Sequence, residues 1–107
     1  MNSEGAPTQI EPGVKVEIDG RTHTARHGSV LGREGTIAKD YFEKFSTVSR
    51  RHAKITKDGG RWYVTVPASV ANSTMWDGVE MKRDHPYPIV GEHIFKLSDQ
   101  CVVRLKL

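Results

Sequence analysis

Short runs in which apolar and polar residues alternate, each closed by a turn signal, most constrain the fold of this chain. Residues 14–18 alternate in this way, and Asp19-Gly20 follows them as a dipeptide typical of tight hairpins. The clearest run ends the sequence, where one side of an extended strand carries Cys101, Val103, Leu105 and Leu107. A period of two residues predicts strands with one buried face.

The same pattern predicts a series of short strands. After the Asp19-Gly20 turn we expect them at residues 22–25, 29–33, 53–57, 61–66, 79–81, 93–97 and 101–107. Only residues 40–45 have helical spacing, and this segment is so short that we expect a single helical turn within a loop. Short strands at intervals of roughly 8–12 residues indicate an all-β sandwich or barrel.

The length of 107 residues fits one domain. Residues 1–13 are polar and contain Pro7 and Pro12, so we expect a flexible leader there and the folded domain at residues 14–107. Lys and Arg number 16 against 13 Asp and Glu, which gives a formal net charge of +3. This excess modestly favours an anionic partner, without choosing among nucleic acid, anionic lipid and phosphopeptide.

The single cysteine, Cys101, excludes an internal disulfide and a cysteine-based zinc site, and its apolar surroundings predict a buried thiol. No apolar stretch reaches the length of a membrane span, and the N-terminus lacks the pattern of a signal peptide. We therefore expect a cytoplasmic protein that does not bind a membrane.

Ser49 and His52 raise the question of catalysis, because a hydroxyl beside an imidazole can act as a nucleophile. The Gly-x-Ser-x-Gly elbow is missing, however, since Val48 and Arg50 flank Ser49. The five histidines show no paired spacing of metal ligands, and no cluster of carboxylates joins them. We expect neither an enzyme nor a bound metal or cofactor.

Aromatic residues could also serve as stacking platforms for nucleic acid. Trp62 falls on the apolar face of its strand, which predicts burial, whereas Trp76 and Tyr87 fall in predicted loops and are better placed for exposed contacts. Nucleic acid is therefore an alternative partner rather than the expected one.

Three groups of residues have the chemistry of an anion site: Gly32-Arg33, then Ser49-Arg50-Arg51-His52, then Asn72-Ser73-Thr74. Arginine offers a rigid fork of donors that matches a phosphate, and a serine hydroxyl adds one short directional donor. An asparagine side chain can both donate and accept, so it can hold a peptide backbone. The sequence alone leaves open whether the three groups meet in space.

In this order, the groups resemble the forkhead-associated (FHA) domain. Leu31-Gly32-Arg33 and Val48-Ser49-Arg50-Arg51-His52-Ala53 are close to the usual sequence of that family, with Trp62 and Asn72 following, and the resemblance covers residues 14–107. It implies an FHA-type β-sandwich of about eleven strands with peptide-binding loops at one end.

The resemblance also implies roles for single residues. Arg33 would contact the phosphate of a phosphothreonine, Ser49 would donate its hydroxyl, and Arg50 would add a second positive side chain. Asn72 would bind the peptide backbone just after the phosphothreonine. Gly32 and His52 would be the scaffold of the site, and further contacts are expected from Thr47, Arg51, Ser69 and Ser73.

The implied partner is a threonine-phosphorylated protein or peptide, a Ser/Thr kinase or its substrate, bound by a monomer. Ala71 and Ser73 depart from the family, which often has Ser or Thr before the asparagine and Gly after it. These departures leave a second reading open, in which the same fold acts as a phosphate-independent interaction domain. Thr8 in the leader is a candidate for phosphorylation and for binding back to the site.

Overall fold

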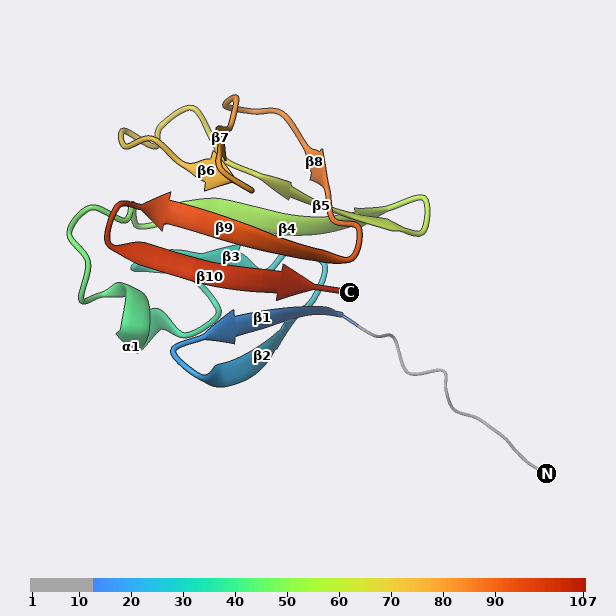
Figure 1. Ribbon diagram of the computed structural model, residues 1–107, viewed down its shortest axis with the longest axis horizontal. Helices are drawn as coiled ribbons and strands as arrows, with labels where there is room; N and C mark the ends of the chain where they lie inside the picture. The colour runs from blue at the N-terminus through green and yellow to red at the C-terminus, as the bar shows by residue number, and fades with distance from the viewer. Residues whose placement is uncertain (1–12) are drawn as a thin grey trace.

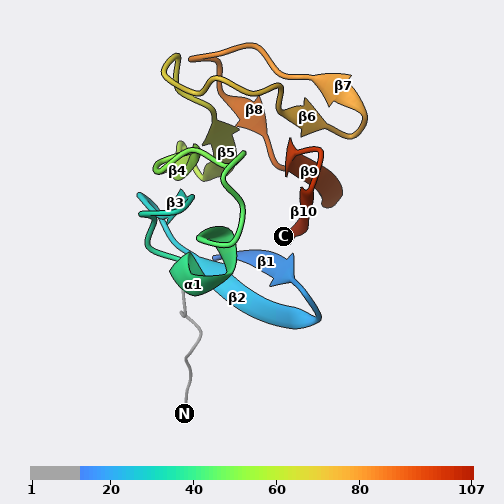
Figure 2. The same cartoon turned by 90° about the vertical axis from the view of Figure 1, so that its left-hand side faces the viewer.

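Two antiparallel sheets form the fold of the computed structural model, which describes residues 13–107 (Figures 1 and 2). The six-stranded sheet has the order β2-β1-β10-β9-β6-β7, and the four-stranded sheet has the order β3-β4-β5-β8. This arrangement confirms the expected all-β sandwich, with ten strands in the described residues. Thr8 and the expected leader, except for its last residue Gly13, lie outside them.

The elements have the following bounds: β1 Val14–Ile18, β2 Arg21–Ala25, β3 Val30–Leu31, α1 Lys39–Phe42, β4 Ala53–Asp58, β5 Arg61–Thr65, β6 Met75–Trp76, β7 Val79–Glu80, β8 Tyr87–Pro88, β9 Glu92–Ser98 and β10 Cys101–Lys106. No helix of residues 13–107 has the length and apolar character that a bilayer span requires.

The first hairpin follows directly from its sequence. β1 and β2 pair in register from Val14 with Ala25 to Ile18 with Arg21, which leaves Asp19 and Gly20 as a two-residue turn. Both turn residues have positive φ, 50° and 78°, the conformation that matches the twist of the flanking strands.

The core lies between the sheets and is lined by the apolar faces that the alternation predicts. Val103 and Leu105 of β10 are buried against residues of the other sheet such as Ile55 and Val64. Trp62 is also buried, as expected. Leu107 differs from the pattern, because β10 ends at Lys106 and the Leu107 side chain is 60% exposed.

A single helical turn, α1, carries the loop between β3 and β4 across one end of the sandwich. Phe42 is fully buried and anchors the turn, while Tyr41 and Phe45 pack against each other with ring centroids 5.2 Å apart. This confirms the expected helical turn, which begins at Lys39, one residue earlier than its apolar spacing suggests.

Two short strands, β6 and β8, were not predicted from the sequence. Trp76 lies in β6 and Tyr87 in β8, and both side chains are partly buried rather than exposed in loops. The Trp76 ring stacks on His93 with centroids 4.3 Å apart and meets Phe95 edge to face. The expectation that Trp76 and Tyr87 serve exposed contacts is therefore wrong.

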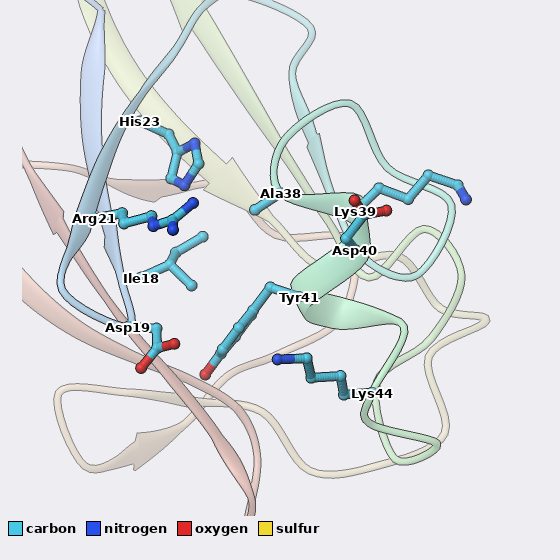
Figure 3. Close-up of a pocket in the computed structure, with 9 residues that line it drawn as sticks. All are labelled: Ile18, Asp19, Arg21, His23, Ala38, Lys39, Asp40, Tyr41 and Lys44. Atoms are coloured by element: carbon cyan, nitrogen blue, oxygen red, sulfur yellow. The ribbon is translucent and has the colours of Figure 1, made fainter.

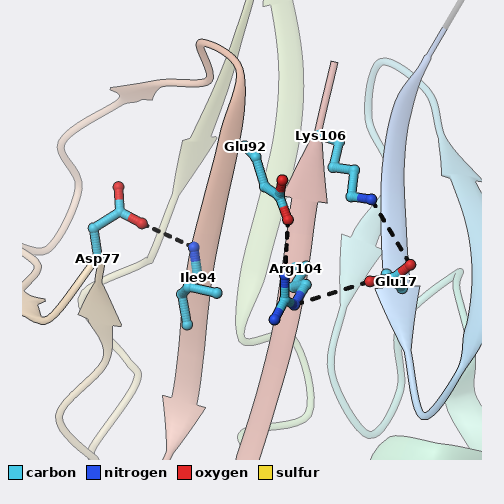
Figure 4. A network of polar contacts seen from close by, with 6 residues as sticks. All are labelled: Glu17, Asp77, Glu92, Ile94, Arg104 and Lys106. Atoms are coloured by element: carbon cyan, nitrogen blue, oxygen red, sulfur yellow. Dashed lines mark hydrogen bonds and ion pairs between the residues drawn. The ribbon is translucent and has the colours of Figure 1, made fainter.

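The outer face of the six-stranded sheet carries a row of opposite charges (Figure 4). Arg104 on β10 lies between Glu92 on β9, at 2.9 Å, and Glu17 on β1, at 3.9 Å. Lys106 also approaches Glu17, at 3.8 Å. Because these side chains are partly exposed, each pair contributes at most about 1 kcal/mol, and their main effect is to favour this strand order over alternatives with like charges opposed.

Candidate functional site

The loops that carry the predicted residues lie at one end of the sandwich, opposite the hairpin that joins β4 to β5. They are the β3–α1 loop (residues 32–38), the α1–β4 loop (residues 43–52) and the β5–β6 loop (residues 66–74). Figure 2 looks onto this end. Since β4 begins here and β5 ends here, antiparallel pairing of these two strands places their loops together.

The β3–α1 and α1–β4 loops are joined backbone to backbone. The Arg33 N–H donates to the Ser49 carbonyl at 3.1 Å, and the Glu34 N–H donates to the Arg50 carbonyl at 2.7 Å. Gly32 permits this approach, because a Cβ there would lie 2.4 Å from the Arg50 carbonyl oxygen. Its φ of 151° is a second reason why only glycine fits.

Arg33 is held at the site by a hydrogen bond that occupies only one of its donors. Its Nε donates to the Val48 carbonyl at 2.5 Å, and the side chain is partly buried. The two terminal nitrogens have no partner among the described residues, so they remain available for a bidentate contact with an oxyanion.

His52 lies beneath the α1–β4 loop and is fully buried. Its Nδ1 accepts a hydrogen bond from the Ser49 N–H at 3.0 Å, which requires the proton of the neutral ring to be on Nε2. Nε2 then donates to the Thr74 hydroxyl at 2.7 Å. Burial, with a smaller contribution from the positive charge of Arg83, lowers the pKa of His52 to about 4.

The β5–β6 loop is tied to the same structure through Asn72. Its Nδ2 donates to the Thr47 carbonyl at 2.8 Å, while the Thr47 hydroxyl donates to Ser98 at 2.8 Å. Asn72 Oδ1 has no hydrogen-bond partner within residues 13–107, and neither does the Ser49 hydroxyl. Both groups can therefore bind a ligand without breaking a contact in the protein.

Two further side chains hold these loops in place: Arg83, which sequence analysis did not assign to the site, and Thr74, which it placed in the third group of site residues without a role. Arg83 contacts three carbonyl oxygens: Nε reaches Val70 at 3.2 Å, Nη1 reaches Met81 at 3.4 Å and Nη2 reaches Asn72 at 2.7 Å. Thr74 is fully buried between His52 and the backbone of Leu97. No local motif marks Arg83, and the burial of Thr74 could not be predicted, because both act through partners distant in sequence.

The other predicted residues are distributed around the site. Arg50 is exposed, and its Nε lies 3.7 Å from Glu34, a contact weak enough for the side chain to turn toward a ligand. The Ser73 hydroxyl donates to Glu80 at 3.3 Å, toward β7. Arg51 and Ser69 line a hollow of about 590 Å³ on the neighbouring face of the four-stranded sheet.

A second hollow, of about 520 Å³, lies between the first hairpin and α1 (Figure 3). Arg21, Lys39 and Lys44 line it together with Asp19 and Asp40, so its charges nearly balance. Lys39 is also paired with Glu43. None of the predicted site residues lines this hollow, and the described residues hold no group of three or more possible metal ligands.

Comparisons with known proteins agree with the fold. The family model described as the FHA domain matches residues 29–105. No curated protein matches the sequence. Among solved structures, the FHA domain of FhaA is similar, with 22% identity over 88% of this chain and all of its own, and a TM-score of 0.68.

Two further solved structures are comparable. One, from a study of phosphothreonine-dependent FHA domain interactions, shows 21% identity over 88% of this chain and 95% of its own, with a TM-score of 0.68. The FHA domain of human APLF, in complex with a bisphospho peptide of XRCC1, shows 20% identity over 89% of this chain and 98% of its own, with a TM-score of 0.64. At this level of identity the likeness establishes the fold.

Proposed function

Because the chain belongs to the FHA domain family, we propose that it is a phosphothreonine-peptide binding module that mediates phosphorylation-dependent protein interactions, and not an enzyme. The solved FHA structures similar to it include one from work on phosphothreonine-dependent interactions and one with a bisphospho peptide. The proposed partner is a threonine-phosphorylated protein, a Ser/Thr kinase or its substrate, met in the cytoplasm by a monomer.

The observation that carries the proposal is a set of available donors and acceptors on loops that are tied together. The terminal nitrogens of Arg33 and the Ser49 hydroxyl would bind the phosphate, with Arg50 as a mobile second cation. Asn72 Oδ1 would accept from the peptide backbone. The backbone N–H of Ser49 is bound by His52, and the side-chain Nδ2 of Asn72 is bound by the Thr47 carbonyl. The Ser49 hydroxyl and Asn72 Oδ1 are therefore in place before the ligand arrives.

Nucleic acid is a poorer fit. Trp62 is buried, and Trp76 is partly buried with one face of its ring stacked on His93, so neither ring is a freely exposed platform for bases. The basic residues at the loops are also few and discrete rather than a continuous groove.

Calorimetric titration with matched threonine and phosphothreonine peptides tests the proposal. Each charge-assisted hydrogen bond contributes about 1.5–3 kcal/mol, so we expect micromolar binding of the phosphorylated form alone. Arg33→Ala should abolish binding, and Ser49→Ala should weaken it about tenfold or more. Lys15→Ala removes the same charge from an exposed position on β1 and should leave binding nearly unchanged.

A second candidate is a phosphate-independent contact surface on the same loops. Ala71 brings no hydroxyl to the site, and Ser73 directs its hydroxyl to Glu80, so the β5–β6 loop adds no side-chain hydroxyl next to Asn72. If threonine and phosphothreonine peptides bind equally, or a partner complex survives Arg33→Ala, this second function replaces the first.

A further inference from the structure

The hollow on the outer face of the four-stranded sheet adjoins the phosphate-binding loops. Arg51 directly follows Arg50, and Ser69 lies in the same loop as Asn72. Most of the remaining lining comes from the sheet, where Lys54 of β4 is paired with Thr65 of β5 and with Val30 of β3. Directly opposed residues of antiparallel strands point to the same face, so these side chains surround one depression.

This hollow has an excess of positive charge. Arg51 and Lys54 are exposed, and neither has an ion-pair partner in the described part of the chain. Asp84 is the one carboxylate of its lining, and Oδ1 of that residue accepts a hydrogen bond from the Ala68 N–H at 3.2 Å. By contrast, Arg104 on the other sheet is paired with Glu92 and Glu17.

The polar groups around the two cations suit an anion as well. Thr56, Thr65 and Ser69 line the hollow with hydroxyl groups that can donate hydrogen bonds. Val30, which is nearly fully buried, and Pro67 also line the hollow and supply an apolar surface for the aliphatic part of a side chain. A carboxylate on a short aliphatic stem matches this combination.

We infer that this hollow is a second anion subsite for the ligand, which takes an acidic side chain of the same peptide that places its phosphothreonine at Arg33 and Ser49. The inference rests on the proposed function and adds a sequence preference to it. Continuity through Arg50-Arg51 lets one extended peptide reach both places, and the unbalanced charge of Arg51 and Lys54 selects Glu or Asp over neutral residues.

A glutamate scan tests the subsite. Peptides with a central phosphothreonine and otherwise alanine flanks carry one Glu, moved from four residues before the phosphothreonine to four after it. We expect one position to tighten binding about three- to fivefold relative to the all-alanine peptide at physiological salt. That gain should disappear in Lys54→Ala and shrink in Arg51→Ala.

Arg61→Ala is the matched control, because Arg61 is an exposed cation on β5 near the other end of the same sheet. The Glu-to-Ala comparison is made within each variant, so a general weakening of phosphopeptide binding by the loss of one charge cancels. The subsite is overturned if phosphopeptides bind but no position gains, or if the gain survives both substitutions. Absence of all phosphopeptide binding overturns the proposed function together with the subsite.

Discussion

His52 illustrates how one residue can link the site to the stability of the fold. The folded chain holds its ring neutral, because burial lowers the pKa to about 4 from an ordinary value of 6.5. Above pH 6.5 both the folded and the unfolded chain have a neutral ring, so the His52 contribution is fully present. Between pH 6.5 and 4 His52 binds a proton in the unfolded chain but not in the folded chain, so the free energy of unfolding falls as the pH falls.

The expected loss reaches about 3 kcal/mol by pH 4, as an upper figure for one fully buried group. Urea unfolding measured from pH 7 to pH 4 checks it, with His52→Gln as the variant that removes this titration. His85→Gln, at an exposed position, is the control. Equal slopes of unfolding free energy against pH in the wild type and His52→Gln would contradict the assignment.

Some residues of the site could be predicted from the sequence and others could not. Arg33 and Ser49 could be chosen because their neighbours form recognisable motifs and because their donors suit a phosphate. Arg83 could not, since an arginine in a polar loop has no distinctive pattern, and Thr74 could be placed in the Asn72-Ser73-Thr74 group but not identified as the buried partner of His52. Their roles depend on partners brought close only by the folded chain, as with the Val70 and Asn72 carbonyls at Arg83.

At the scale of elements, Arg83 positions the β5–β6 loop, and this gives a second prediction. Arg83→Lys replaces a planar fork by a single ammonium group that cannot reach Val70, Met81 and Asn72 together. We expect faster amide hydrogen exchange in residues 70–74 and roughly fivefold weaker phosphopeptide binding, the cost of about one hydrogen bond. Lys82→Ala, at the neighbouring exposed position, should change neither. Unchanged exchange in Arg83→Lys would show that the loop holds its shape without this side chain.

Strands were predictable where their pattern is long enough to show a period. β1, β4, β5, β9 and β10 have five to seven residues each and were expected at nearly these positions. β6 and β8 have two residues each, too few to show alternation, and β8 contains Pro88. They exist because they lie against β9 and β5, which is a property of the tertiary fold.

At the scale of the whole molecule, the sequence pattern could not predict the order of the strands in the sheets. Alternation shows which residues face the core but not which strands become neighbours, and β1 pairs with β10 from the opposite end of the chain. Residues 13–107 therefore form the site only when both sheets are assembled, since Thr47 is linked to Ser98 near the end of β9 and His52 to Thr74 before β6. Binding at these loops should therefore stabilise the entire fold.

Ligand binding is therefore expected to raise the unfolding temperature of the whole domain. With a dissociation constant of about 10 µM, about 1 mM phosphopeptide adds about 2.7 kcal/mol to the free energy of unfolding, roughly 10 °C or more for a domain of this size. Thermal unfolding followed by circular dichroism measures it, with the unphosphorylated peptide and the Arg33→Ala variant as controls that should show no shift. A shift of equal size with the unphosphorylated peptide would mean that the loops recognise the backbone alone, because the charge-assisted bonds from Arg33 and Ser49 need the phosphate to form.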